Sequence, residues 1–324
     1  MLEKNIQQKI RLEWVDVLRA LAILFVVYGH RVPTVWFSAF FNPIKMPLFF
    51  ALSGYLFHIK PGGDIVYFKK TLKSLIIPWL FLGLVPLLLS LPLMGLNHTL
   101  NSIVKLFTGD LLWFMPCFII AQIIFYYVIK LTKNYLILVT ILIIIISAIG
   151  YILRQKEILN TCMVNVAMMV QFYFYIGYLY KKYENTFRNH RLTLGITLLM
   201  SYLIIAVIFY PLSGVDVHNG AFACLPIGLV MTVIGLLCLF MLSSLITHLP
   251  KFLLTVGKNS LVIYMLDRYV LLPFMSIYNF ANPPAPYYLV FFVALLYLVY
   301  TSTINIYIAK ILNKYIPWST GGRG

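Results

Sequence analysis

The segment that decides the fold runs from Asp16 to His30 and reads DVLRALAILFVVYGH. It belongs to an apolar run over residues 15–36, which is long enough to cross the roughly 30 Å hydrocarbon core of a bilayer as a helix. Side chains three or four residues apart are neighbours on a helix, and eleven residues complete about three turns. Asp16, Arg19 and His30 therefore share one face, on which Arg19 and His30 lie about 16 Å apart along the axis.

This polar face allows two interpretations. Ionisable groups within a membrane span are costly and usually face a cavity or a partner, which favours a polar channel with His30 as a general base. In the alternative, Asp16 and Arg19 form an ion pair at the membrane surface, and His30 merely ends the helix on the outer side. The sequence leaves both interpretations open.

The rest of the chain is also strongly apolar. Of its 324 residues, 62% are hydrophobic and only 10% are charged, and the mean hydropathy is +0.92. A soluble domain is about half apolar and about a quarter charged, so lipid must cover part of this chain. We predict an all-α, polytopic transmembrane helical bundle that forms a single domain over residues 1–324. About ten spans are expected, at residues 15–36, 44–59, 72–95, 111–130, 135–153, 160–180, 192–212, 221–247, 252–274 and 286–312.

The net charge of +16 comes from Lys and Arg residues in short loops between the spans, which is typical of a membrane protein and argues against nucleic acid as a partner. With the N-terminus inside, the inner segments hold 18 of these residues and the outer segments hold 5. This bias predicts a multi-pass protein of the cell inner (cytoplasmic) membrane with both termini cytoplasmic and an even number of spans. The four cysteines are scattered through apolar runs, so we expect no metal site.

Further polar and aromatic residues punctuate the later spans, and each has two interpretations. Ser53 precedes Gly54 in the short second span and suits close helix packing or a binding site. Trp113 opens the fourth span and suits an aromatic belt at the interface or stacking on a sugar ring. Asn165 and Gln171, in the sixth span, suit interhelical hydrogen bonds or substrate binding.

The ninth span carries Tyr264 and then two adjacent charges, Asp267 and Arg268, well inside the apolar run. Adjacent residues on a helix point to different sides, so these two side chains are expected to have separate partners. One of them is a candidate to pair with the polar face of the first span.

Four motifs occur in order along the chain. They are Asp-x-x-Arg followed after ten residues by His (16–30), Pro-Leu-Phe-Phe-x-Leu-Ser-Gly (47–54), Leu-Trp-Phe (112–114) and Gly-Lys-Asn-Ser-Leu-x-Ile-Tyr (257–264). Together they resemble the acyltransferase-3 superfamily of membrane O-acyltransferases, over essentially the whole chain. The most similar subgroup is that of the fucose 4-O-acetylase-like sugar acetyltransferases.

The resemblance implies transfer of an acetyl or other acyl group from cytosolic acyl-CoA to a hydroxyl of a cell-surface or lipid-linked polysaccharide. Acetyl-CoA would then be a donor substrate, with no permanently bound cofactor. The implied partners are acyl-CoA, the sugar acceptor and the lipid bilayer, and the sequence favours no oligomeric state. The candidate catalytic residues are His30, Asp16, Arg19 and Asp267, and the candidate substrate-binding residues are Arg268, Ser53, Trp113, Asn165, Gln171 and Tyr264.

Elementary chemistry agrees with this implication. A sugar hydroxyl must lose a proton as it attacks a thioester, and a neutral imidazole suits that task near pH 7. Whether His30 acts as this base or transiently carries the acyl group stays open. The oxyanion needs positive charge, which Arg19 or Arg268 would supply, unless they bind the CoA phosphates instead. Relatives often have His where this chain has Asp267, which suits a carboxylate that orients His30 or a different substrate.

Two other classes of function fit the same architecture. One is a membrane transporter or exporter that moves a glycan or an acyl group without catalysis, for which broken helices and an inverted repeat would be the signature. The short second span is compatible with this class, but the sequence has no convincing repeat. The other class is a structural membrane subunit.

Overall fold

The computed structural model describes residues 12–30, 35–59, 63–246, 250–267, 269–270 and 287–321. The described chain is all-α apart from one pair of two-residue strands, β1 (Val215–Asp216) and β2 (Ala221–Phe222), which pair antiparallel. The α-helices are α1 (Glu13–Gly29), α2 (Val35–Tyr55), α3 (Gly63–Thr71), α4 (Ile77–Leu89), α5 (Leu91–Met94), α6 (Leu96–Thr108), α7 (Phe114–Leu131), α8 (Leu136–Gln155), α9 (Val164–Met169), α10 (Gln171–Phe187), α11 (Arg191–Ile208), α12 (Leu225–Ser243), α13 (Lys251–Lys258), α14 (Ser260–Leu266) and α16 (Tyr287–Tyr315).

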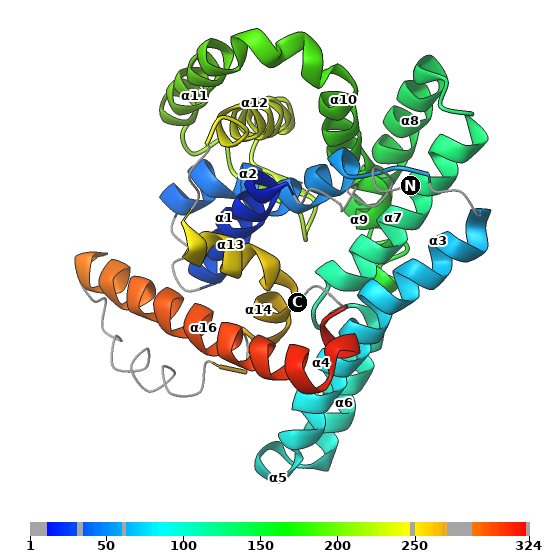
Figure 1. Ribbon diagram of the computed structural model, residues 1–324, viewed down its shortest axis with the longest axis vertical. Helices are drawn as coiled ribbons and strands as arrows, with labels where there is room; N and C mark the ends of the chain where they lie inside the picture. The colour runs from blue at the N-terminus through cyan, green and yellow to red at the C-terminus, as the bar shows by residue number, and fades with distance from the viewer. Residues whose placement is uncertain are drawn as a thin grey trace, which may run out of the picture.

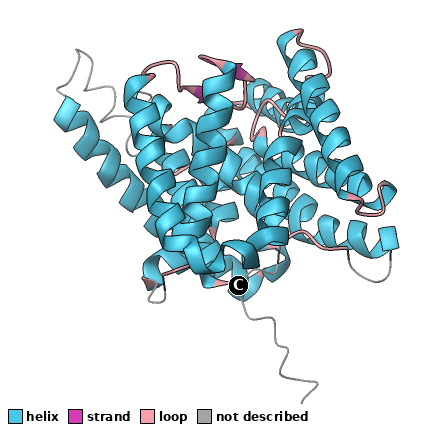
Figure 2. Cartoon of the chain, turned by 90° about the horizontal axis from the view of Figure 1, so that it is seen from above, coloured by secondary structure: helices cyan, strands magenta, loops and turns pink. Residues whose placement is uncertain are grey.

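Helix α1 lies inside the bundle and packs against α2, α13, α14 and α16 (Figure 1). Seen at right angles in Figure 2, the strand pair lies at one end of the bundle and the C-terminal end of the chain lies at the other. Leu12, just before α1, and Gly321 line the same cavity, so both ends of the described chain lie at one end of the bundle. This placement agrees with an even number of membrane crossings.

Glycines allow the central helices to cross at very short range. A Cβ built on Gly177 of α10 would overlap the backbone oxygen of Ala51 in α2, and one on Gly54 of α2 would overlap that of Phe174 in α10. Gly257 of α13 makes the same kind of approach to the backbone of Asp16 in α1. Such contacts hold helices together where lipid provides no hydrophobic driving force. They also fix the height of α1 and α2 relative to their neighbours.

Six helical stretches among the described residues are long and apolar enough to cross a membrane: Gly63–Leu89, Phe114–Leu131, Leu136–Gln155, Gln171–Ile208, Leu225–Ser243 and Phe291–Tyr315. They coincide with seven of the predicted spans, because the stretch 171–208 joins α10 and α11 and covers two of them. Many apolar side chains on α8 and α11 face outward, as expected of surfaces that contact lipid. The chain is therefore a multi-pass membrane protein.

The other three predicted spans do not meet these criteria, so the structure does not establish ten crossings. Helix α1 has 17 residues and is about 25 Å long, and α2 carries Asn42, Lys45 and two prolines. The span predicted over 252–274 is interrupted at Asn259, where the backbone leaves the helical region between α13 and α14. These are the helices on which most of the candidate site residues lie.

Two further boundaries differ from the prediction. The span predicted at 72–95 is the end of a longer helix that begins at Gly63 and passes through a π-helical turn at Leu72–Ile76. The span predicted at 160–180 begins instead with a tight turn, because Cys162 and Met163 have left-handed backbone conformations and α9 starts only at Val164. Single π-turns inside helices occur frequently at functional sites. The π-helical turn at Leu72–Ile76 borders the cavity described next.

Candidate active site

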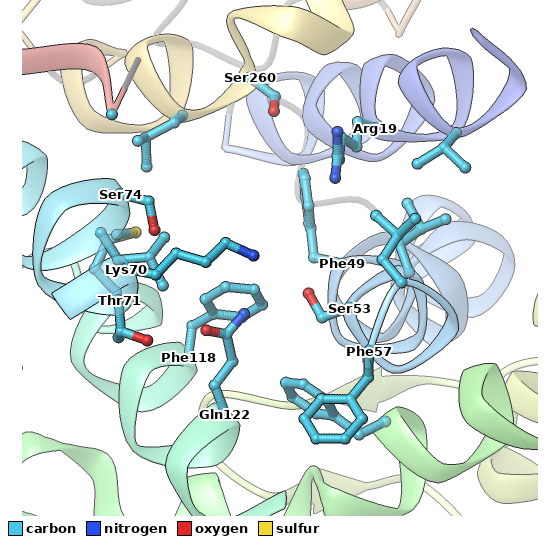
Figure 3. Close-up of a pocket in the computed structure, with 18 of the residues that line it drawn as sticks. Arg19, Phe49, Ser53, Phe57, Lys70, Thr71, Ser74, Phe118, Gln122 and Ser260 are labelled. Atoms are coloured by element: carbon cyan, nitrogen blue, oxygen red, sulfur yellow. The ribbon is translucent and has the colours of Figure 1, made fainter. Parts of the chain in front are cut away.

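A cavity of about 680 Å³ lies between α1, α2, α3, α7 and α14. Its apolar walls are made mostly by phenylalanine, leucine and methionine side chains, among which a few polar groups are set. Figure 3 shows Arg19 of α1 and Lys70 of α3 extending into the same space, with Ser53 of α2 and Gln122 of α7 beside them. Among the described residues that line the cavity, Arg19 and Lys70 are the Lys and Arg side chains and Asp16 is the one carboxylate, so the cavity suits an anionic ligand with an apolar arm.

Arg19 is held by Asp16, as the spacing predicts. Its Nη1 donates to Oδ1 of Asp16 at 3.1 Å, and the Asp16 side chain is buried while that of Arg19 is 30% exposed. Both residues line the cavity, so the ion pair that the sequence suggested is present and forms part of the cavity wall.

His30 lies at the other end of α1 and makes the most informative contact in the molecule. Its Nδ1 lies 3.0 Å from Oδ2 of Asp267, a residue 237 positions later that follows α14 directly. The other carboxylate oxygen, Oδ1, accepts a hydrogen bond of 2.6 Å from the Tyr297 hydroxyl of α16. The Asp267 side chain is 5% exposed, whereas that of His30 is 52% exposed.

This arrangement combines features of both interpretations of the first span. His30 does end α1, but it ends the helix against a buried carboxylate that is itself held by a tyrosine. Because a carboxylate accepts hydrogen bonds, the contact places the proton of a neutral His30 on Nδ1. Nε2 of the neutral ring then carries the lone pair.

The cavity and the His30–Asp267 pair lie close together, although His30 does not line the cavity. Tyr264 of α14 lines it, and Asp267 follows three residues later, about one helical turn further along. The Tyr264 hydroxyl accepts a hydrogen bond of 3.2 Å from the backbone N–H of Phe114, which closes the cavity on that side. One helical turn therefore separates Tyr264, which lines the cavity, from the Asp267 residue of the pair.

Two predicted substrate-binding residues lie away from the cavity. Asn165 is completely buried, and its amide bonds to the Ile158 carbonyl at 2.8 Å, to Asn160 and to the start of α9. Gln171 donates from Nε2 to the carbonyls of Ala121 and Ala167. Gln171 thus joins α10 to α7 and α9, and Asn165 holds the turn that follows α8 against the start of α9, so both amides have packing roles, which is one of the interpretations that the sequence left open.

Trp113 is also outside the cavity, at the start of α7. Its ring centroid lies 5.0 Å from that of His218, in the turn between β1 and β2. Burial lowers the pKa of His218 below its usual range, although the carboxylate of Asp216 opposes this shift. His218 is therefore neutral near pH 7, and the two rings form an aromatic surface near one end of the bundle. Arg268 lies outside the described residues.

The structure also brings in residues that the sequence did not single out as site residues. From the sequence, Lys70 was expected in a loop between two spans. It lies on α3 instead, and it reaches the cavity because this helix begins at Gly63, earlier than expected. Tyr297 is one tyrosine among several in α16, and no sequence pattern distinguishes it. Within the described part of the chain, His, Cys, Asp and Glu side chains form no group of three or more that would hold a metal ion.

Comparison with known proteins gives one match. A family model described as an acyltransferase domain, that of acyltransferase 3, matches residues 12–304. These residues include α1 through most of α16 and so contain every group described above. No curated protein and no solved structure matches the chain.

Proposed function

The chain belongs to the acyltransferase 3 family and is therefore a membrane acyltransferase, and from this premise we propose that it transfers an acetyl or similar acyl group from cytosolic acyl-CoA to a sugar hydroxyl. The acceptor that we propose is a cell-surface or lipid-linked polysaccharide, as in the fucose 4-O-acetylase-like proteins that the motifs resemble. One observation carries the proposal: a cavity lined by two cations is also lined by Tyr264, which lies one helical turn before the buried carboxylate of Asp267 that contacts His30. Because the family is one of acyltransferases, we do not propose a transporter that moves a glycan or an acyl group without catalysis.

In the reaction that we propose, His30 is the general base. Nε2 takes the proton of the acceptor hydroxyl while its oxygen forms a bond to the thioester carbon, and the carbonyl electron pair moves onto oxygen. The tetrahedral intermediate then collapses, the carbon–sulfur bond breaks, and the CoA thiolate receives the proton from His30. Asp267 holds the ring through Nδ1 and stabilises the imidazolium that forms between these steps.

Tyr297 and Asp267 also account for a departure from relatives, which often carry His at position 267. A carboxylate in contact with His30 can orient the ring and balance the charge of the imidazolium, which a neutral imidazole at this position would not do. The hydrogen bond from Tyr297 keeps Asp267 in place and satisfies its second oxygen. The 52% exposure of His30 leaves room for a bulky acceptor on that side.

The donor occupies the cavity in this proposal. The CoA phosphates bind Arg19 and Lys70, and the pantetheine arm extends along the apolar wall toward Tyr264. Arg19 lies about 16 Å from His30 along α1, so an extended arm is needed to bring the thioester to the base. An apolar cavity with a cationic mouth matches the two chemical halves of acyl-CoA.

The direct test of the proposed activity uses protein purified in detergent with isotope-labelled acetyl-CoA. We expect release of the CoA thiol, and we expect label in a sugar acceptor drawn from the membranes of the same cells. Thiol release or label no greater than in a mock preparation of the same membranes would exclude this activity.

A substitution at Arg19 tests the position of the donor. Arg19→Lys keeps the charge but loses the planar fork that binds a phosphate through two hydrogen bonds. We expect the apparent KM for acetyl-CoA to rise about tenfold, equivalent to about 1.4 kcal/mol, while saturating donor largely restores the rate. A donor titration measures both quantities. Arg188→Lys makes the same change at an exposed site outside the cavity and should leave both unchanged. An unchanged KM with a collapsed maximal rate would remove Arg19 from the donor site.

The orientation of the chain is a further prediction. We propose that both termini are cytoplasmic, because the predicted inner loops carry most of the Lys and Arg residues and both ends of the described chain border the donor cavity. Two reporters would each be fused after Gly324, one that is active only in the cytoplasm and one that is active only on the outer side. We expect activity from the cytoplasmic reporter alone. Activity from the outer-side reporter alone would reverse the topology and place the cavity away from cytosolic CoA.

A further inference from the structure

A lysine beside the end of α1 has no role in the account so far. Lys45 lies in α2 between Pro43 and Pro47, and it is only partly exposed. Its Nζ lies 5.4 Å from the centroid of the Phe37 ring, a distance typical of a cation–π contact. No carboxylate lies within ion-pair distance of it among the described residues. The carboxylate of Asp216 in β1 acts on the ammonium group only from beyond ion-pair distance. A cation held without a direct ion pair inside a helical bundle is costly, so a function is the default explanation.

The location of this lysine is defined by Gly29, the residue before His30. A Cβ built on Gly29 would lie 3.1 Å from Lys45 Nζ and would collide with the Phe37 ring. Glycine at this position therefore leaves the space that Phe37 and the ammonium group occupy. The ammonium group lies against the backbone of the last turn of α1, one residue from the general base.

Helix α2 also connects Lys45 with the donor cavity. Lys45 itself does not line the cavity, but the next residue, Met46, does, as does Phe49 one turn later. Helix α2 therefore has residues at the donor cavity and, one position earlier, a cation beside the last turn of α1.

The reaction needs a positive charge at this point. When the acceptor attacks, the thioester oxygen becomes an oxyanion, and a cation fixed beside it lowers the barrier. Arg19 was one candidate from the sequence, but it is bound to Asp16 about 16 Å from His30. Asp267 cannot serve, because it is negatively charged and already holds His30. Lys45 is the cation that the described structure places next to the base.

We infer that Lys45 is a further catalytic residue, whose ammonium group stabilises the oxyanion of the tetrahedral intermediate formed at His30. This inference rests on the proposed acyl transfer from acyl-CoA. The bonds formed and broken are those given above, and Lys45 neither gains nor loses a proton. The oxygen carries a negative charge only while the intermediate exists, so Lys45 stabilises the intermediate and not the bound donor. Loss of Lys45 should therefore lower kcat and leave the KM for acyl-CoA largely unchanged.

The test measures release of the CoA thiol from acetyl-CoA alone, with water as the acceptor, so that no glycan is needed. Lys45→Met keeps the length of the side chain and removes the charge, whereas Lys45→Arg keeps the charge. We expect the Met variant to lose about 10²-fold in kcat with the KM for acetyl-CoA within about twofold of wild type, the size seen when one oxyanion donor is removed. The Arg variant should keep most of the activity.

The controls separate three kinds of failure. Lys105→Met, at an exposed position of α6, should behave as wild type. A Lys45→Met rate within about threefold of wild type would overturn the inference, as would a lower rate accompanied by a lower melting temperature that Lys45→Arg does not restore. If the wild-type protein does release the CoA thiol, either of these results would overturn only the inference about Lys45 and would not affect the proposed function. Absence of thiol release from the wild-type protein would refute the proposed function and this inference together.

Discussion

Replacing His30 with Ala is expected to abolish acyl transfer while the protein still inserts and folds. A positioned general base contributes about 10²–10⁴-fold to a rate, and water does not replace a ring that Asp267 holds in a fixed orientation. The side chain is half exposed at the end of α1, so its removal leaves no cavity in the core. The measurement is the initial rate of CoA-thiol release by purified variant and wild type, with elution from size exclusion as the check on folding.

Two further variants sharpen this comparison. His98→Ala removes an exposed histidine of α6 and should keep the wild-type rate. Asp267→Asn keeps the size of the side chain but weakens the hold on the imidazolium, so it should lower the rate less than His30→Ala does. A His30→Ala rate within about threefold of wild type would exclude the ring as the base.

Adding a single methyl group at Gly177 should cost the protein more stability than most core substitutions. The new Cβ would overlap the backbone oxygen of Ala51, and backbone atoms cannot move aside as a flexible side chain does. Overpacking typically costs about 1–3 kcal/mol and sometimes more, and here α2 and α10 must separate along their whole contact. We expect Gly177→Ala to lower the melting temperature sharply or to prevent recovery of folded protein in detergent.

The matched control for this effect is Gly214→Ala. A Cβ at Gly214 would meet its nearest neighbours at 3.6 and 3.8 Å, which are ordinary van der Waals distances. Thermal unfolding of both variants in the same detergent should therefore show a large shift only for Gly177→Ala. Equal melting temperatures would mean that α2 and α10 do not cross as closely as described. Because α2 carries Ser53 and Lys45, any folded Gly177 variant should also lose activity.

Helical periodicity placed Asp16, Arg19 and His30 on one face of α1, and the structure shows the first two as neighbours that line the cavity, whereas His30 does not line it. The Asp16–Arg19 contact is a local one between neighbours on that helix and was expected. The His30–Asp267 contact joins residues 237 positions apart. The sequence indicated that one of the two charges in the ninth span would pair with the first span, but it did not indicate which charge or which residue, since periodicity within a helix carries no information about contacts between helices.

The remaining differences come from packing between helices. Asn165 and Gln171 are polar residues in an apolar segment, and composition alone does not separate an amide that joins helices from one that binds a ligand. Lys70 was counted as a loop cation because hydropathy placed the start of its span at residue 72, and Lys45 was counted with the outer segment because it lies at the very start of the span predicted at 44–59. The breaks at Asn259 and Cys162 arise from backbone conformations that apolar runs do not reveal.

Mass spectrometry of surface glycans tests the central claim most directly. Glycans would be taken from cells that lack the protein, cells that carry the wild type and cells that carry His30→Ala, each grown with isotope-labelled acetate. We predict a labelled acetyl ester on a sugar hydroxyl only in the wild-type sample, with the variant present in the membrane at a similar level. Identical glycans in all three samples, or esters that persist with His30→Ala, would contradict acyl transfer to a surface glycan through His30.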